Sequence, residues 1–154
     1  GEDPDLTLRL WQKGFETAFV EEAFVYHKRR ISWEKYFQQV KKFGQTRAIL
    51  NRWHPQSRKI VNWFPTLFLI GFLISLLLLF VGEWGFIFIY IAYFILIFFD
   101  SKRINHSSQI GYLSVWAVCL QFYAYGTGFL GATLRILGSK KSPEELFPKL
   151  FFKK

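Results

Sequence analysis

The segments FPTLFLIGFLISLLLLFV (64–81), FIFIYIAYFILIFF (86–99) and IGYLSVWAVCLQFYAYGTGFLGATL (110–134) decide the fold. None carries a charge, and GEWG (82–85) and DSKRINHSSQ (100–109) separate them. A helix needs about 20 mostly apolar residues to cross a bilayer, so the first and third segments are long enough. The second spans if 84–85 are included and the membrane thins slightly. The sequence therefore predicts a mostly helical membrane protein, with about three transmembrane helices near 64–82, 84–99 and 110–134.

The charges lie outside these segments and give the chain a net charge of +9. Of the 20 Lys and Arg, 12 lie in residues 1–64, two in the 100–109 loop and six after Leu134. Basic flanks favour the cytoplasmic side of a membrane, so the N-terminal part and the Lys102–Arg103 loop are expected there, and the Glu83 turn outside. Three complete crossings would put the basic tail outside. Either the tail is an exception to the rule, or the third segment does not cross completely.

Composition also bears on partners and on completeness. Basic runs beside membrane spans are typical of anchors to anionic lipid, so we expect a membrane partner and no nucleic acid. The single cysteine, Cys119, cannot form an intrachain disulfide. About 60 residues precede the first span, near the lower limit for a soluble unit that folds unaided, and no signal-peptide pattern opens the chain. We therefore expect a fragment whose missing part lies upstream.

Residues 1–31 have the pattern of a short helix followed by two short strands. Asp3 suits the N-cap, Pro4 the first helical position, and Gly14 the stop. Thr17–Val20 and Phe24–His27 are β-prone, and we expect each to form an edge strand of a sheet whose other strands are absent from this chain.

Residues 32–63 predict an amphipathic helix from Trp33 to about Trp53, capped by Ser32, and a linker. At about 100° per residue, one face is aromatic and apolar and the other polar. The apolar face holds Trp33, Tyr36, Phe37, Val40, Phe43 and Leu50, and the polar face holds Lys35, Gln38, Gln39, Lys42 and Thr46. Such a helix before a membrane span is typical of one that lies in the bilayer interface. Arg47 falls near the centre of the apolar face, where it must reach lipid headgroups, pair with a carboxylate or bind an anion.

In the third apolar segment, small residues recur on one helical face. Ala124, Gly128 and Ala132 lie four residues apart, and Gly126 and Gly131 add to them. Small side chains let helices approach closely, so this face is expected to pack against another helix.

The residues able to do chemistry are few. Glu2, Asp3 and Asp5 form the densest acidic cluster, and the dipole of a helix stabilises a carboxylate at its N-terminus. Asp3 can cap the helix or act as a general base for a hydroxyl acceptor, and the two roles are compatible. His27, His54 and His106 are too far apart to show metal-ligand spacing. No Gly-rich phosphate loop or nucleophile motif is present.

The combined order of these motifs resembles family 2 glycosyltransferases of the GT-A fold. Residues 1–6 (GEDPDL), with Arg9 and residues 13–15 (KGF), are similar to that family's Glu-Asp segment, which opens a helix under the acceptor site. Residues 23–30 (AFVYHKRR) look like the family's last strand and basic exit. Residues 33–50 are similar to the interfacial helix that joins the catalytic domain to C-terminal membrane helices. Phe64-Pro65 and 126–130 (GTGFL) fit bacterial, membrane-bound members.

This resemblance implies a division of the chain. Residues 1–31 would be the C-terminal edge of a GT-A α/β domain, 32–63 the interfacial helix and linker, 64–138 the transmembrane region and 139–154 a basic tail. Asp3 would be the base that deprotonates the acceptor hydroxyl, with Glu2 beside it. His27, Arg29, Arg30 and Arg47 would lie near the donor diphosphate. Since Ala48 follows Arg47, the Gln-x-x-Arg-Trp motif of processive members is not present, which argues against a polymerase.

The resemblance implies an enzyme of the inner (cytoplasmic) membrane of a bacterium. It would transfer a sugar from a nucleotide-sugar donor to a lipid or glycan acceptor. A divalent cation, Mg or Mn, is expected for the full-length enzyme, with its ligands outside this chain and His27 the one candidate within it. The nucleotide-binding strands and the Asp-x-Asp motif are not in this sequence, so the chain alone is expected to be incomplete. The alternative is a small, non-enzymatic membrane adaptor that binds anionic lipid or a partner protein.

Overall fold

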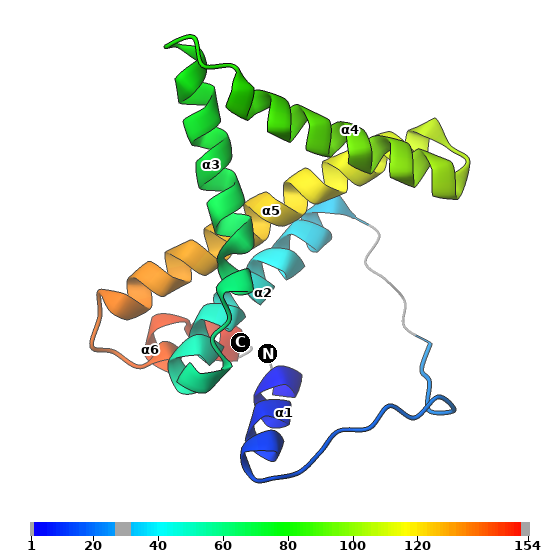
Figure 1. Cartoon of the computed structure of the whole chain (residues 1–154). Helices are drawn as coiled ribbons and strands as arrows, with labels where there is room; N and C mark the ends of the chain where they lie inside the picture. The colour runs from blue at the N-terminus through cyan, green and yellow to red at the C-terminus, as the bar shows by residue number, and fades with distance from the viewer. Residues whose placement is uncertain (1, 27–31, 152–154) are drawn as a thin grey trace.

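The computed structural model describes residues 2–26 and 32–151, and they are mostly helical (Figure 1). The elements follow one another as α1 (Glu2–Gln12), α2 (Trp33–Trp53), two short 3-10 helices η1 (Pro55–Ser57) and η2 (Ile60–Trp63), α3 (Phe64–Leu79), α4 (Gly85–Asn105), α5 (Ser108–Leu137), α6 (Pro143–Leu146) and α7 (Pro148–Phe151). Helix α1 begins at Glu2, so Asp3 lies in its first turn and not at the predicted N-cap.

The two predicted strands are wrong for the part of the chain that the structure describes. Residues 15–20 and 23–26 are irregular, with a turn at 21–22, and His27 lies outside the described residues. Local β-propensity makes a strand only when a neighbouring strand pairs its backbone. The described residues offer no such neighbour, and the side chains of Phe19 and Tyr26 are 92% and 96% exposed.

Within residues 2–26 and 32–151, three helices are long and apolar enough to span a membrane: Ile60–Leu79, Gly85–Asn105 and Ser108–Leu137. They correspond to the three predicted spans. Helix α4 continues six residues beyond the predicted end at Phe99 because its polar last turns bond internally. Arg103 pairs with Asp100 at 3.1 Å, and the Asn105 amide donates to the Ser101 carbonyl at 2.9 Å. His106, in the left-handed region with φ 51°, ends the helix.

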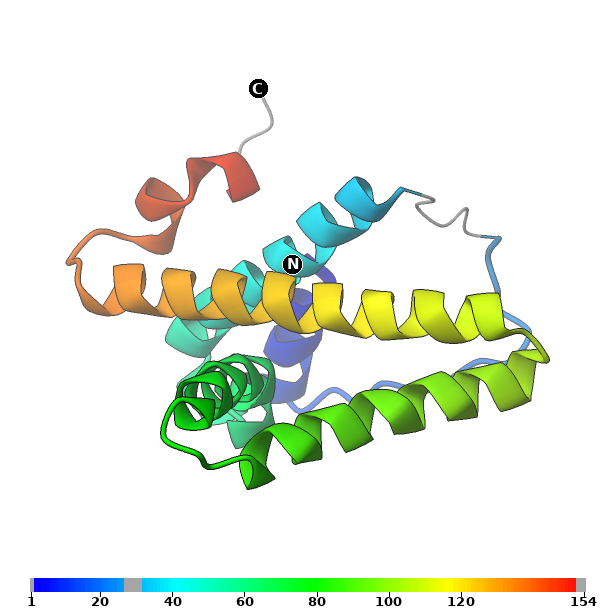
Figure 2. The same cartoon turned by 90° about the horizontal axis from the view of Figure 1, so that it is seen from above.

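The core lies between α2 and α5, which run side by side (Figures 1 and 2). The Tyr36 hydroxyl donates to Gln121 at 3.0 Å, and Ala48 packs in one cluster with Ala132, so the two helices run in the same direction. The predicted range of the amphipathic helix, Trp33 to Trp53, is confirmed, and the Ser32 hydroxyl accepts from the Lys35 backbone N–H as expected.

The predicted small-residue face of α5 is confirmed as a packing face, since Ala124, Gly128 and Ala132 are all buried. Its counterpart on α2 is Val40, Gly44 and Ala48, which follow the same four-residue spacing. Gly131 was expected to join this face, but an added Cβ there would meet open space. At about 100° per residue, Gly131 lies about 60° around the helix from Gly128, at the edge of the face that contacts α2.

The tail folds back onto α2. The Phe147 side chain is only 6% exposed and joins the core cluster of Ala48, Ile49, Phe129 and Ala132. The ring of Phe151 lies 5.7 Å from that of Trp53, centroid to centroid. These contacts put α6 and α7 on the same side of the molecule as the C-terminal half of α2 (Figure 1).

Candidate functional site

Asp3 and Arg47 are distant in sequence but line the same cavity, which has a volume of about 470 Å³. Four segments form its wall: α1, α2, η2 and α5. Its lining residues are Asp3, Pro4, Phe43, Thr46, Arg47, Leu50, Asn62 and Tyr125. We call this space the Asp3–Arg47 cavity. It joins one exposed carboxylate, one guanidinium and an aromatic wall.

A partly buried hydrogen-bond network holds α1 against the end of α2. His54, the C-cap of α2, is 7% exposed. Its Nε2 lies 2.7 Å from Asp5 Oδ1, and its Nδ1 lies 2.9 Å from the amide nitrogen of Gln12. A neutral imidazole with its proton on Nε2 satisfies both contacts. The network fixes the position of α1, and therefore of Asp3, relative to Arg47.

Asp5 is the charged member of this network. Burial alone would raise the pKa of Asp5. Hydrogen bonds from His54 and Arg9, together with the positive charge of Arg9 at 2.7 Å, outweigh burial and hold the pKa below its usual value. Asp5 is therefore ionised at neutral pH and anchors α1. Asp3, in contrast, takes part in none of the ion pairs among the described residues, and it lines the cavity.

Arg47 is partly buried, and its guanidinium interacts with the phenol oxygen of Tyr125 on α5. None of the ion pairs among the described residues includes Arg47. Of the three arrangements that the sequence left open for this guanidinium, pairing with a carboxylate is therefore not seen in residues 2–26 and 32–151. Its place in the wall of a cavity suits the binding of an anion.

Sequence reasoning missed Asn62. It also lines the Asp3–Arg47 cavity, and its side-chain nitrogen is buried with no hydrogen-bond partner in the described chain. A buried donor without a partner is unfavourable by about 1–3 kcal/mol. The signal was present in the sequence: Asn62 interrupts the otherwise apolar run from Ile60 to Pro65.

The other predicted site residues are not placed in this cavity. Glu2 is the first residue of α1, and its side chain is not among those described. His27, Arg29 and Arg30 lie outside the described residues. Within the described ranges, no three His, Cys, Asp or Glu side chains gather closely enough to hold a metal ion. The described residues therefore offer no set of ligands for a divalent cation, and no chemical step is assigned to one.

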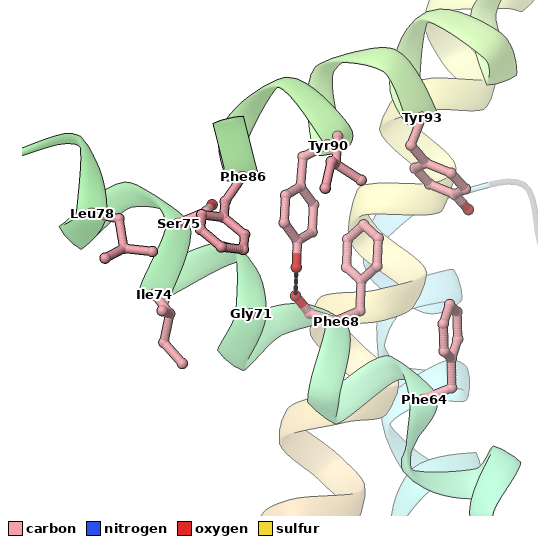
Figure 3. Close-up of a pocket in the computed structure, with 10 residues that line it drawn as sticks. Phe64, Phe68, Gly71, Ile74, Ser75, Leu78, Phe86, Tyr90 and Tyr93 are labelled. Carbon is pink, nitrogen blue, oxygen red and sulfur yellow. Dashed lines mark hydrogen bonds between the residues drawn. The ribbon is translucent and has the colours of Figure 1, made fainter. Parts of the chain in front are cut away.

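A second cavity, of about 490 Å³, lies between α3 and α4 (Figure 3). Aromatic and aliphatic side chains such as Phe64, Phe68 and Phe86 line it, and the Tyr90 hydroxyl donates to the Phe68 carbonyl at 3.1 Å. Its wall has no acidic or basic side chain. It therefore offers neither a base nor an anion site, and the Asp3–Arg47 cavity is the better candidate for chemistry.

One comparison with known proteins is informative. The model of the family described as Glycosyl transferase family group 2 matches residues 1–102. No curated protein and no solved structure is significantly similar to the chain. The matched range contains α1, α2, α3 and most of α4, and with them Asp3, Arg47 and Asn62.

Proposed function

Because the chain belongs to glycosyl transferase family group 2, we propose that it forms the acceptor side and the membrane anchor of an enzyme that transfers a sugar from a nucleotide-sugar to a lipid-linked acceptor. The observation that carries the proposal is the shared cavity of Asp3 and Arg47. The family match does not favour the alternative of a non-enzymatic adaptor.

Asp3 acts as the general base. The acceptor hydroxyl gives its proton to the carboxylate, and the acceptor oxygen forms a bond to the anomeric carbon of the donor. The bond from that carbon to the diphosphate breaks, and its electron pair leaves with the nucleotide diphosphate. The place of Asp3 in the first turn of α1 supports this role, because a carboxylate there interacts favourably with the helix dipole. The exposure of Asp3 leaves it within reach of a substrate.

Arg47 and Asn62 bind the donor and orient it. The guanidinium of Arg47 offers a cation and several N–H donors to the diphosphate, in a partly buried place where charge-assisted hydrogen bonds are strong. The unpaired amide of Asn62 donates to an oxygen of the same substrate. The exposed ring of Phe43 forms the apolar part of the wall, which suits an acceptor attached to a lipid.

Substitution of Arg47 tests this assignment. We expect Arg47→Gln to raise the KM for the donor by about 10–100-fold, because it removes a charged hydrogen bond to the diphosphate. Arg47→Lys keeps the positive charge but lacks the planar guanidinium, which can donate two parallel hydrogen bonds. The KM for the donor should therefore rise less than in Arg47→Gln. Arg52→Gln is the matched control, since Arg52 lies on the same helix outside the cavity. Steady-state kinetics of transfer, with donor concentration varied, measures all three. An unchanged KM and kcat in Arg47→Gln would remove Arg47 from the site.

We also propose the placement of the protein in the cytoplasmic membrane of a bacterium. Helices α3 and α4 cross it, and α1, α2 and the basic tail lie on the cytoplasmic side, as the distribution of Lys and Arg favours. Helix α2 carries five basic residues, Lys35, Lys41, Lys42, Arg47 and Arg52. Each would be unfavourable by about 2.5 kcal/mol or more at the centre of a bilayer, so α2 stays at the interface.

The packing of α2 has a consequence for α5. The C-terminal half of α5 runs alongside α2, and the tail contacts the end of α2 through Phe147 and Phe151. A helix parallel to an interfacial helix also lies along the interface. This supports the second of the two possibilities that the sequence left open, in which α5 does not cross completely and the basic tail remains cytoplasmic.

Cysteine labelling tests this topology. In a Cys119→Ala background, we expect Lys141→Cys and Lys102→Cys to react with a membrane-impermeant maleimide only after the cells are opened, because both lie on the cytoplasmic side. Glu83→Cys should react in intact cells, since the α3–α4 turn faces outward. A permeant maleimide that labels all three variants controls for exposure. Labelling of Lys141→Cys in intact cells would show that α5 crosses completely.

A further inference from the structure

We propose that a third pocket, lined by basic residues, binds the phosphate group of an anionic lipid. The pocket has a volume of about 530 Å³ and lies where the tail meets α2 and the end of α5. Its lining residues are Gln38, Lys41, Lys42, Gln45, Arg135, Leu146, Phe147, Pro148, Lys149 and Leu150. We call it the basic pocket.

The charge of the pocket points to an anionic ligand. Its four ionisable side chains are all cationic: Lys41 and Lys42 from α2, Arg135 from α5 and Lys149 from α7. None of the ion pairs among the described residues involves any of them. Like charges repel one another, so a cluster with no carboxylate in its wall is more favourable when an anion is bound. Gln38 and Gln45 add neutral hydrogen-bond donors.

Packing of the tail builds the pocket. Phe147 is buried in the α2–α5 core, and Pro143 is buried as the first residue of α6. The Ser142 hydroxyl caps α6 by accepting from the Glu145 backbone N–H at 3.3 Å. These contacts fix the chain immediately before Lys149 and bring its cation to the lysines of α2, which are more than 100 residues away in sequence.

The rest of the wall favours a lipid over a soluble anion. Leu146, Phe147, Pro148 and Leu150 make it apolar beside the cations. A phosphate attached to hydrocarbon suits both parts of the wall, since the cations bind the headgroup and the apolar residues pack against the acyl chains. The interfacial position of α2 places the pocket at the depth where lipid phosphates lie.

The basic pocket is separate from the Asp3–Arg47 cavity. Its α2 residues (38, 41, 42 and 45) and those of the cavity (43, 46, 47 and 50) share no member. At about 100° per residue they fall on opposite faces of α2, with the α5 contact face of Val40, Gly44 and Ala48 between them. The inference therefore does not rest on the sugar-transfer proposal.

The test is equilibrium binding of short-chain phosphatidylglycerol to the protein in a neutral detergent. We expect the double variant Lys42→Gln/Lys149→Gln to weaken binding by about 30-fold, from the loss of two cations near the headgroup. The matched control, Lys35→Gln/Lys59→Gln, removes the same charge outside the pocket and should change binding by about twofold or less. Lys42→Arg/Lys149→Arg keeps the charges and should restore binding, which excludes misfolding as the cause.

Two further ligands decide what is recognised. Phosphatidylcholine, which has no net charge, should bind much more weakly than phosphatidylglycerol. Inorganic phosphate should not displace the lipid at equal concentration. Displacement by inorganic phosphate would overturn the lipid assignment in favour of a soluble anion. Equal weakening in the pocket variant and the control variant would overturn the site altogether, since it would reflect general charge attraction.

Discussion

Asp3→Asn is expected to lower the kcat of sugar transfer by about 100-fold or more while the fold is kept. General-base catalysis contributes about 10²–10⁴-fold, and an amide cannot accept the proton of the acceptor hydroxyl. Asp3 is exposed, and its side chain takes part in none of the ion pairs among the described residues. The contact between Asp5 and His54 holds α1 in place instead. The measurement is the rate of product formation at saturating donor and acceptor, beside the circular dichroism of both proteins.

Two variants make this result specific. Asp100→Asn is the same chemical change at an exposed position at the far end of α4, and it should keep full activity. Asp3→Glu keeps a carboxylate but moves it, so we expect a rate between those of Asp3→Asn and the unaltered protein. Turnover of Asp3→Asn within about threefold of the unaltered protein would remove Asp3 from the mechanism, since that is far below the contribution of a general base.

Gly44→Ala is expected to disrupt the α2–α5 contact. A Cβ at Gly44 would lie 2.8 Å from the backbone nitrogen of Phe129 and closer still to the carbonyl oxygen of Tyr125. Backbone atoms cannot rotate away as a side chain can, so the helices must separate. Overpacking of this kind destabilises by about 1–3 kcal/mol, against a gain of up to about 1 kcal/mol from helix propensity. We therefore expect a lower thermal unfolding midpoint in detergent.

The control for this variant lies in the same helix pair. Gly131→Ala adds a Cβ that meets no atom within 4 Å, so it should leave the midpoint unchanged or raise it. Gly128→Ala should behave like Gly44→Ala, because its Cβ would lie 2.5 Å from the carbonyl oxygen of Lys41. A midpoint for Gly44→Ala equal to that of Gly131→Ala would show that the two helices are not packed as described.

Separation of α2 from α5 would also affect the site. Arg47 lies on α2 and Tyr125 on α5, and both line the Asp3–Arg47 cavity. We therefore expect Gly44→Ala to reduce sugar transfer as well as stability, although Gly44 does not line the cavity. The paired glycines of the two helices thus connect the packing of the protein to its proposed chemistry.

Local patterns predicted the helices well. Ser32 and the break at His54-Pro55 give the range of α2, and uncharged runs give the three helices that are long and apolar enough to span a membrane. The small residues of α5 indicated close packing, but nothing in the sequence named Gly44 as the partner of Gly128. A packing partner depends on how two distant helices meet, and helical periodicity within one segment does not contain that information.

The strands and the network around α1 show the limits of local reasoning. Thr17–Val20 has β-propensity, but a strand depends on a partner, and the described residues supply none. His54 follows a helix and precedes a proline, which predicted only a break. Its bonds to Asp5 and Gln12 join segments more than 40 residues apart, and so they follow from the tertiary fold alone. The resemblance predicted roles in sugar transfer for Asp3 and Arg47. The structure shows that the two line one cavity, and that Asn62 lines it as well.

The central claim is that Asp3 and Arg47 line one substrate site, with the acceptor at Asp3 and the donor diphosphate at Arg47. Protection of cysteines from alkylation tests it most directly. Asp3→Cys, Arg47→Cys and, as a control outside the cavity, Arg52→Cys are made in the Cys119→Ala background. Saturating donor and acceptor together should slow alkylation at positions 3 and 47 by about the same factor and leave position 52 unaffected. Protection at one of positions 3 and 47 without the other would contradict the account.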